Sequence, residues 1–282
     1  MFGKIETIRL DLLGLKKDSS IYLEPESDEQ MYNVGCDLEA IKKTDRRIIR
    51  NDNRFTFFGG DQIDAITPFD KRFNRDTEIE FDLDEQIAGW NKIHAKLFEA
   101  HKEQKNKVKN QTEYNCVNEK VWGLEWGNHE YKIRDLTRQR IVNRFCKPND
   151  IEFLGSRAII GLRIQWKKEV LAEWRIGIMH GSGGGKPESM FRDMKKNWDC
   201  DAYICGHLHQ KRFQPEIVYD FDWETGKPYA RDIVLANAGT FQQPVVTDVD
   251  GYLDRKNCIE ATGIGTITLE FNGYEGKING HV

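Results

Sequence analysis

The sequence lacks the features that mark membrane, secreted, repetitive or disordered proteins. No apolar run approaches the roughly 18 residues that a membrane-spanning helix needs. Residues 1–14 lack the basic start and the compact apolar stretch of a secretory signal. The chain has no internal repeat and no low-complexity segment. These absences predict a globular protein of the cytoplasm with no membrane association.

Cysteine pairs and an excess of basic charge are also missing. The six cysteines are scattered without C-x-x-C spacing, which argues against a structural zinc site and indicates reduced thiols. The net charge of −4 gives no general basic field for nucleic acid, although a local groove could still be basic. A chain of 282 residues can bury a substantial core. We expect one domain over residues 1–282.

What the sequence does contain is a series of short apolar runs that end in glycine, aspartate, asparagine or histidine. This arrangement is typical of α/β enzymes, which place functional loops after strands. Four such runs cover residues 54–58, 121–126, 174–179 and 202–205. Later strand-like runs, at 217–221, 232–235 and 265–271, predict the second sheet of a sandwich.

A polar segment between the first two of these runs, at residues 82–109, predicts helices. Apolar residues recur at helical spacing at Ile87, Trp90, Ile93 and Leu97. We therefore expect a helical insertion at about residues 69–118. His94 and His101 lie in it, and we assign both of them ordinary surface or packing roles.

Four of the seven histidines lie beside glycine at the predicted strand ends. These are His129, His180, His207 and His209, and Asp61, Asp64 and Asn128 occupy similar positions. Imidazole together with carboxylate and amide oxygen suits Mn²⁺, Fe²⁺, Zn²⁺ or Ni²⁺. The sequence therefore predicts a metal centre at the ends of the strands.

The order of the motifs makes the prediction more specific. G-D-x-x-D at 60–64, G-N-H-E at 127–130, H-G at 180–181 and G-H-x-H at 206–209 follow one another. In this order the chain resembles the calcineurin-like metallophosphoesterases of phage and prokaryotic type, over roughly residues 21–245. The resemblance implies a four-layer α/β sandwich, with two mixed β-sheets flanked by helices. A phage-encoded member would act in the host cytoplasm.

The resemblance also implies a role for each residue of the motifs. Asp61 would bridge two divalent metal ions, most simply Mn²⁺, and Asn128, His180 and His207 would complete one metal site. His209 would belong to the other site, together with an aspartate of the first motif. His129 would contact the phosphate and protonate the leaving oxygen, and Asp64 would orient its neighbours. A bridging carboxylate fixes the separation of two cations that activate water for in-line attack.

The first motif departs from the family pattern. The family has D-x-H at the end of its first strand, and the best candidate is Asp28-Glu29-Gln30, after a strand predicted at residues 21–23. Asp28 and Gln30 are then candidate ligands, with glutamine in the place of histidine. The alternative interpretation is that residues 24–30 form a solvated acidic loop, which would leave one metal site weak or empty.

The loop after His180 invites comparison with a phosphate-binding P-loop. The glycine spacing before Lys186 is short by one residue, and Pro187 stands where serine or threonine is needed. We interpret the segment as a metal-ligand histidine followed by a loop over the site.

Two hypotheses for function follow from the resemblance. The first is an enzyme that hydrolyses a phosphodiester or phosphomonoester by attack of a metal-bridging hydroxide. Its substrate would be DNA or a nucleotide, with a DNA exonuclease-like activity leading; cyclic nucleotides, nucleotide diphosphate compounds and phosphoproteins are alternatives. The second, motivated by Gln30 and Tyr32, is a degenerate scaffold that binds metal or a protein partner of unknown kind and catalyses little.

Overall fold

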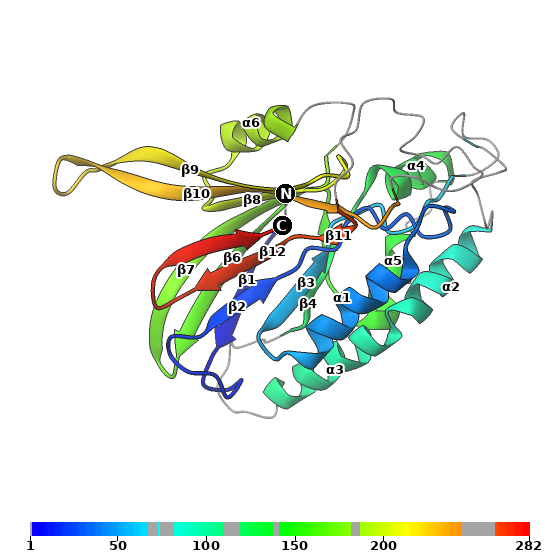
Figure 1. Cartoon of the computed structure of the whole chain (residues 1–282), viewed down its shortest axis with the longest axis horizontal. Coiled ribbons are helices and arrows are strands. Elements are labelled where there is room, and N and C mark those ends of the chain that lie inside the picture. The colour runs from blue at the N-terminus through cyan, green and yellow to red at the C-terminus, as the bar shows by residue number, and fades with distance from the viewer. Residues whose placement is uncertain are drawn as a thin grey trace.

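Two β-sheets pack face to face, and helices cover the outer face of each sheet (Figure 1). The computed structural model describes residues 2–66, 73, 82–109, 119–137, 141–181, 187–243 and 263–282. In these residues both sheets combine parallel and antiparallel strands. The predicted four-layer α/β sandwich of two mixed sheets flanked by helices is confirmed.

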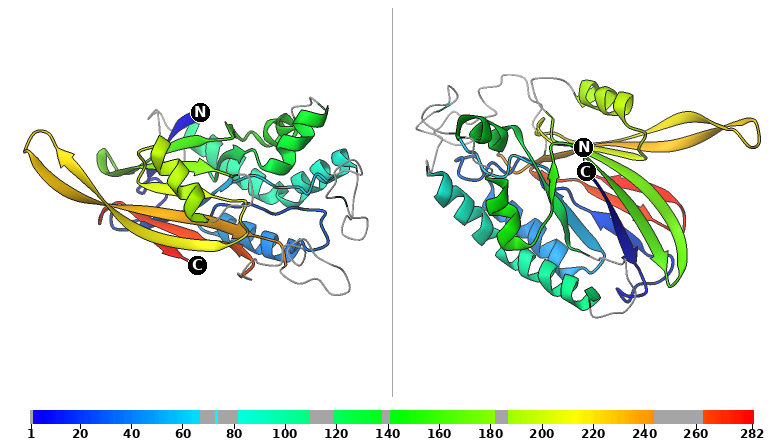
Figure 2. Two further views of the ribbon diagram at one scale, coloured as in Figure 1. Left: turned by 90° about the horizontal axis from the view of Figure 1, so that it is seen from above. Right: turned by 180° about the vertical axis from the view of Figure 1, so that it is seen from behind.

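The larger sheet has seven strands, in the order β1-β6-β7-β8-β10-β11, and β9 pairs with β10. Its strands are β1 (Phe2–Arg9), β6 (Ala158–Trp166), β7 (Glu169–Met179), β8 (Ala202–Cys205), β9 (Lys211–Asp222), β10 (Lys227–Thr240) and β11 (Gly265–Thr266). β7, β8 and β10 run parallel to one another at the centre. The β9–β10 hairpin projects from the body of the molecule in every view (Figures 1 and 2).

The smaller sheet has six strands, in the order β13-β12-β2-β3-β4-β5. They are β2 (Ser20–Leu23), β3 (Arg54–Phe58), β4 (Val121–Glu125), β5 (Phe153–Gly155), β12 (Thr268–Asn272) and β13 (Lys277–His281). The neighbours β2, β3, β4 and β5 are all parallel. Their carboxyl ends therefore meet at one edge of the sheet.

Two expectations about the strands are wrong. The strand at residues 21–23 is the second of the chain, because β1 precedes it and pairs with the distant β6. The strands after residue 206 do not form a second sheet by themselves. β9 and β10 join β8 in the larger sheet, whereas β12 pairs with β2 in the smaller one. Both sheets are thus assembled from the two ends of the chain.

Six helices lie in the described part of the chain. They are α1 (Leu38–Arg50), α2 (Leu83–Ile93), α3 (Ala95–Lys109), α4 (Asn128–Thr137), α5 (Val142–Asn149) and α6 (Pro187–Asn197). Apolar residues of α1, α2, α3 and α5 pack with those of β3 and β4, and α6 packs on β8 and β10. α2 and α3 lie within the predicted insertion at 69–118, whose residues 69–72, 74–81 and 110–118 lie outside the described residues. No described helix is both long and apolar enough to cross a membrane.

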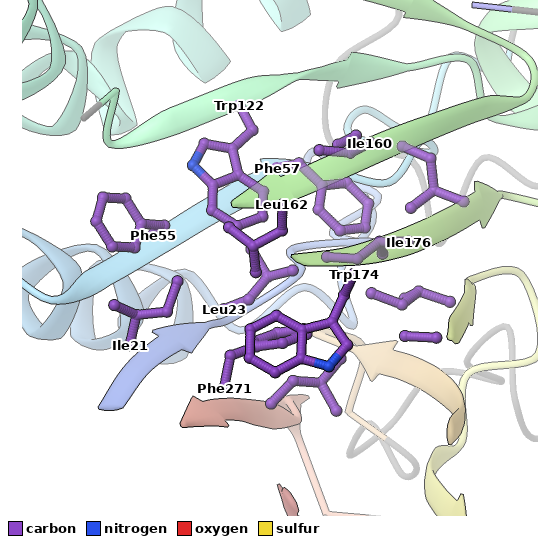
Figure 3. Packing of buried hydrophobic residues seen from close by; sticks show 14 of the residues in the cluster. Ile21, Leu23, Phe55, Phe57, Trp122, Ile160, Leu162, Trp174, Ile176 and Phe271 are labelled. Carbon is purple, nitrogen blue, oxygen red and sulfur yellow. The ribbon is translucent and has the colours of Figure 1, made fainter. Parts of the chain in front are cut away.

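The main core fills the space between the two sheets (Figure 3). Phe55 of β3 stacks on Trp122 of β4, with ring centroids 5.7 Å apart. Trp174 of β7 meets Phe271 of β12 edge to face at 5.4 Å, which joins the two sheets. Aromatic pairs of this kind add about 0.5–1.5 kcal/mol to what burial alone provides. This rigid core holds the ends of the central strands in place.

α1 carries a charged residue, Asp45, on the face that packs against the sheet. α1 begins after Asp37, whose side chain accepts a hydrogen bond from the backbone N–H of Ala40 at 2.9 Å, a helix N-cap. Its buried residues, Ile41, Thr44, Asp45 and Ile48, recur at intervals of three and four. Asp45 is therefore a charged residue on the apolar face of a helix, buried against the sheet.

Candidate metal centre

All eight predicted site residues lie at strand ends along one edge of the sandwich. The loop after β2 carries Asp28 and Gln30, the loop after β3 carries Asp61, α4 begins with Asn128 and His129, His180 follows β7, and His207 and His209 follow β8. Asn128 and His207 are half-buried and the other six are buried. The fold thus brings residues that are up to 181 positions apart in the sequence to a single edge of the sandwich.

Carboxylate and imidazole groups approach one another closely at this edge. His180 Nε2 lies 3.1 Å from Asp61 Oδ2. Ligand atoms of Asp61, His180 and His207 all lie within 4.8 Å of one another. A second carboxylate, Asp28 Oδ1, lies 3.2 Å from His209 Nε2 and 3.9 Å from His180 Nε2. The groups form one continuous cluster that Asp61 and Asp28 share with the histidines.

Backbone carbonyls fix the orientation of two of the imidazoles. His180 Nδ1 lies 2.6 Å from the carbonyl oxygen of Gly59, to which it donates. His129 Nδ1 donates in the same way to the carbonyl oxygen of Asp64. With Nδ1 protonated, the neutral ring presents the lone pair of Nε2 to the cluster. Metal-ligating histidines are commonly held by such a hydrogen bond on the other nitrogen.

Several buried polar atoms in the cluster have no hydrogen-bond partner. They are Asp28 Oδ1, Gln30 Oε1, Asn128 Oδ1 and His180 Nε2. Leaving a buried polar atom unsatisfied costs about 1–3 kcal/mol. His180 Nε2 and Asp61 Oδ2, 3.1 Å apart, are close enough to bind the same cation. These donor atoms are those that Mn²⁺, Zn²⁺ and Fe²⁺ accept, so the residues present fit a metal centre.

Charge and burial oppose each other within the cluster. Burial lowers the pKa of His180, but the carboxylates of Asp61 and Asp28 outweigh it and raise this pKa well above the ordinary value. Burial likewise raises the pKa of Asp61, and the imidazoles of His180 and His129 more than reverse the effect. Without metal, a proton on His180 compensates the acidic groups. A bound cation would take over that role, because metal binding to such ligands releases protons.

The backbone is strained where the ligands are placed. Five of the eight predicted site residues adopt a positive φ that residues other than glycine rarely adopt. They are Asp28 (55°), Gln30 (42°), Asp61 (52°), His207 (69°) and His209 (56°). Each such residue costs on the order of 1–3 kcal/mol, and outliers of this kind concentrate at functional sites. The strained backbone at these residues directs their side chains into the cluster.

Gly60 and Gly127 allow close contact between the loop after β3 and the loop after β4. A Cβ on Gly60 would lie 2.5 Å from the backbone nitrogen of Gly127, and a Cβ on Gly127 would lie 2.0 Å from Asp61. Gly60 also has a φ of +90°. Only glycine at both positions permits this approach. The glycines of the motifs therefore serve the packing of the two loops as well as their turns.

Glu130, to which the sequence assigns no role, joins these two loops. Its carboxylate accepts hydrogen bonds from the backbone N–H groups of Asp61 (3.0 Å), Gln62 (2.7 Å) and Gly127 (3.1 Å). Burial and the nearby charge of Asp61 raise the pKa of Glu130 to about 7. Its place in the G-N-H-E motif is thus explained by the backbone donors that it satisfies.

Ser27 holds Asp28 in a similar way. The Ser27 hydroxyl donates to Asp28 Oδ2 at 2.7 Å, and the backbone N–H of His207 donates to the same oxygen at 2.8 Å. Both bonds leave Oδ1 directed at His209. A lone serine carries no sequence signal for this role, since it depends on a contact with the distant β8 loop.

The acidic loop before the first motif is buried. Glu24, Glu26, Asp28, Glu29 and Gln30 are at most 1% exposed, so the alternative of a solvated loop is wrong. Gln30 reaches the cluster, where its Nε2 lies 3.4 Å from His209 Nε2 and 3.5 Å from His129 Nε2. Its side-chain amide therefore lies between the imidazoles of His129 and His209.

Asp64 stands beside the cluster and does not face it as a ligand would. Its carbonyl oxygen accepts from His129, and its carboxylate accepts from Asn33 Nδ2 at 3.3 Å. These contacts match an orienting role. Residues 182–186 of the loop after His180 lie outside the described residues.

A cavity of about 490 Å³ opens next to Asn128 and His180. Its walls include the aromatic side chains of Trp126, Tyr131 and Trp198, and the exposed cation Arg157. Cavities of this size hold small-molecule ligands, and a few polar groups among apolar walls orient them. The candidate metal centre thus has an adjoining space with both stacking surfaces and a positive charge.

Comparison with known proteins gives a structural likeness and no sequence match. No protein-family model matches the chain, and no curated protein matches it. Similar solved structures include wild-type Vps29 from Entamoeba histolytica complexed with Zn²⁺, and a single mutant of that protein. Each is 11% identical, covers 93% of this chain and 97% of the other, and has a TM-score of 0.37. A likeness this low carries no argument about activity.

Proposed function

We propose that the protein is a metal-dependent phosphoesterase of the calcineurin-like type found in phages and prokaryotes. The observation that carries the proposal is the buried cluster of carboxylate, amide and imidazole groups, in which Asp28 Oδ1, Gln30 Oε1, Asn128 Oδ1 and His180 Nε2 have no hydrogen-bond partner. Ordinary buried polar groups find partners. A cluster with this donor set instead favours divalent cations.

The arrangement supports two neighbouring metal positions. Asp61, Asn128, His180 and His207 would hold one ion, Asp28, Gln30 and His209 would hold the other, and Asp61 would contact both. Two such ions, when bound, lower the pKa of a water between them and polarise the phosphate for in-line attack. Mn²⁺ is the ion that this mixture of oxygen and nitrogen ligands favours in our proposal.

His129 is the proposed proton donor to the leaving oxygen. Its Nδ1–H is held by the Asp64 carbonyl, and its Nε2 lies 3.8 Å from Asp61 Oδ2, at the margin of the cluster. The backbone N–H of His129 also donates to Asp61 Oδ1 at 2.8 Å. The ring is thus anchored on one side, with its other nitrogen directed at the place where phosphate would bind. A positioned imidazole contributes typically 10²–10⁴-fold to such reactions.

The adjoining cavity favours a nucleotide or the end of a DNA strand as the substrate. Bases stack on aromatic side chains without regard to sequence, at about 1–3 kcal/mol each. Tyr131, which is 40% exposed, offers such a surface in the cavity, and Arg157 offers a cation for a flanking phosphate. An exonuclease-like or nucleotide phosphodiesterase activity is therefore the form of the proposal that the cavity supports.

A second candidate function is a scaffold that binds metal or a partner but catalyses little. Gln30 favours it, because an amide is a weaker ligand than a neutral imidazole, and a weak second site would slow the reaction. The two candidates make different predictions about turnover.

Hydrolysis of bis-p-nitrophenyl phosphate with added Mn²⁺ separates the candidates. The wild-type chain should turn over only with metal, and Asp61→Ala should remove the activity while the circular dichroism spectrum stays folded. Glu6→Gln, a buried carboxylate on β1 outside the cluster, should keep full activity as the matched control. No turnover by the wild-type chain with Mn²⁺, Zn²⁺, Ni²⁺ or Mg²⁺ would leave the scaffold as the better account.

A further inference from the structure

A second cluster of buried charged groups lies between the smaller sheet and the helices. Glu26 comes from the loop after β2, Asp45 from the buried face of α1, and His94 from the residue that ends α2. Glu26 and His94 are 0% exposed and Asp45 is 5% exposed. One ligand atom from each of the three lies within 4.8 Å of the other two. Three separate segments of the chain converge on one point.

The imidazole in this cluster is held as a metal-ligating histidine is held. His94 Nε2 lies 3.2 Å from Glu29 Oε2, and that oxygen also accepts from Trp90 Nε1 at 3.0 Å. The other ring nitrogen, Nδ1, lies 3.0 Å from Asp45 Oδ2. A carboxylate that accepts from one nitrogen orients the ring and strengthens the other nitrogen as a ligand. Glu29 is in that position.

Glu26 has no partner that would explain its burial. Neither oxygen of its carboxylate makes a hydrogen bond, and Glu29 Oε1 also lacks one. Burial raises the pKa of Glu26 well above its ordinary value, and the Thr56 hydroxyl, which donates to the Phe57 carbonyl at 3.2 Å, opposes this only in part. An unpaired carboxylate in the interior is among the costliest groups to bury.

The charges in this region do not balance without a further cation. Glu26, Glu29 and Asp45 are three acidic groups, and His94 supplies one positive charge at most. Arg47 and Arg54 both pair with Glu24, and Arg46, next to Asp45 on α1, lies 3.8 Å from Glu39. Buried charges are paired or bind metals. Either protons or a metal ion must compensate the remaining acidic groups.

We propose that Glu26, Asp45 and His94 bind a divalent transition-metal ion at a site separate from the Asp61 cluster. Two carboxylates and one imidazole suit Mn²⁺, Fe²⁺ or Zn²⁺ and are a poor match for Ca²⁺ and Mg²⁺, which prefer oxygen ligands alone. Asp45 also lines a cavity of about 610 Å³, whose walls carry the basic residues Lys42, Arg46, Lys92 and Lys96. The ion would tie α1 and α2 to the loop that carries Asp28.

The competing explanation is a proton on Glu26, and the isosteric variant Glu26→Gln distinguishes the two. Metal-free protein is equilibrated with Mn²⁺, passed through a desalting column, and its metal content measured by mass spectrometry. The proposal predicts that Glu26→Gln retains one Mn²⁺ fewer per chain than the wild type. Glu6→Gln should retain as many as the wild type. Equal metal content in Glu26→Gln and wild type would overturn the proposal, since a neutral amide reproduces a protonated carboxyl.

A measurement on the wild-type chain keeps the test independent of how the variant folds. A crystal grown with Mn²⁺ should give an anomalous difference peak between Glu26, Asp45 and His94. A map with a peak at Asp61 and none at His94 contradicts the second site and leaves the proposed phosphoesterase untouched. The reverse result would retain the second site and count against the proposed function.

Discussion

Glu130 and Asp61, 69 positions apart in the sequence, are joined by a 3.0 Å hydrogen bond from the Asp61 backbone N–H to the Glu130 carboxylate. The same carboxylate accepts from the N–H groups of Gln62 and Gly127. Asp61 itself accepts from the backbone N–H of His129. The loops after β3 and β4 therefore hold each other, and the position of the central carboxylate depends on a residue that need not touch metal or substrate.

Replacing Glu130 should therefore damage stability and metal binding together. Glu130→Ala leaves three buried N–H donors without their acceptor, each worth about 1–3 kcal/mol, so we expect a loss of about 2–5 kcal/mol in unfolding free energy. Glu130→Gln keeps one acceptor oxygen and should lose less. Urea unfolding and Mn²⁺ titration of both variants check this. Equal stability of Glu130→Ala and wild type would contradict the role given to Glu130.

Gln30→His should strengthen the weaker metal position. His207 and His209 show that histidine is tolerated at positive φ in this cluster, and Gln30 has a φ of 42°. Because imidazole binds Mn²⁺ or Zn²⁺ better than an amide does, we expect affinity for the second ion to rise about tenfold or more. Turnover at limiting Mn²⁺ should rise with it.

The control for this gain is the same substitution elsewhere, Gln165→His on β6, which should change neither metal affinity nor turnover. If Gln30→His binds metal no better than the wild type, Gln30 does not occupy a ligand position.

His129→Asn should lower turnover without removing metal. The asparagine amide can replace Nδ1–H as the donor to the Asp64 carbonyl, so the loop keeps its anchor, but the proton donor is lost. We expect kcat to fall roughly 10²-fold or more, with unchanged Mn²⁺ content by mass spectrometry. A variant that loses its metal as well would make His129 a ligand and not the proton donor.

Glu6 gives a pH dependence that is separate from the metal centre. Burial raises the pKa of Glu6 to about 8, against the opposing charge of Lys4. The folded protein then holds this proton more tightly than the unfolded chain does. The stability it contributes is fully present below the unfolded pKa of 4.5 and is lost as the pH rises through about 8.

Unfolding free energies of wild type and Glu6→Gln, measured by urea across that interval, test the assignment. The wild type should lose about 2–4 kcal/mol more than Glu6→Gln does between the two ends. Parallel pH profiles would show that Glu6 ionises normally in the folded state.

The strand ends were predictable from sequence because their signal is local. A short apolar run closed by glycine and a polar residue predicts residues 54–58 and 202–205 as strands, and β3 and β8 have those bounds. The site residues that follow these runs, Asp61 after β3 and His207 after β8, were predictable in the same local way. The choice of pairing partner is different: residues of β12 pair with residues of β2 that lie 246 to 252 positions earlier, and no local pattern in either strand encodes that.

The environment of His94 could not be predicted for the same reason. Helical spacing places it beside Trp90 on a buried face, which predicts packing, and it is fully buried. Its acidic neighbours come from α1 and from the loop after β2, and only the folded chain brings Asp45 and Glu29 to its two nitrogens. Glu130 was missed likewise, since its partners include backbone groups of the distant β3 loop. Ser27 was missed because a serine hydroxyl beside a carboxylate gives no distinctive sequence signal.

The most direct test of the central claim is the rate of bis-p-nitrophenyl phosphate hydrolysis as Mn²⁺ is titrated into metal-free wild-type protein. The account predicts no turnover at the start, a rise that saturates with bound metal, and a return to zero when a chelator is added. A rate that does not depend on metal, or no turnover at any Mn²⁺ concentration that fills the site, would contradict it.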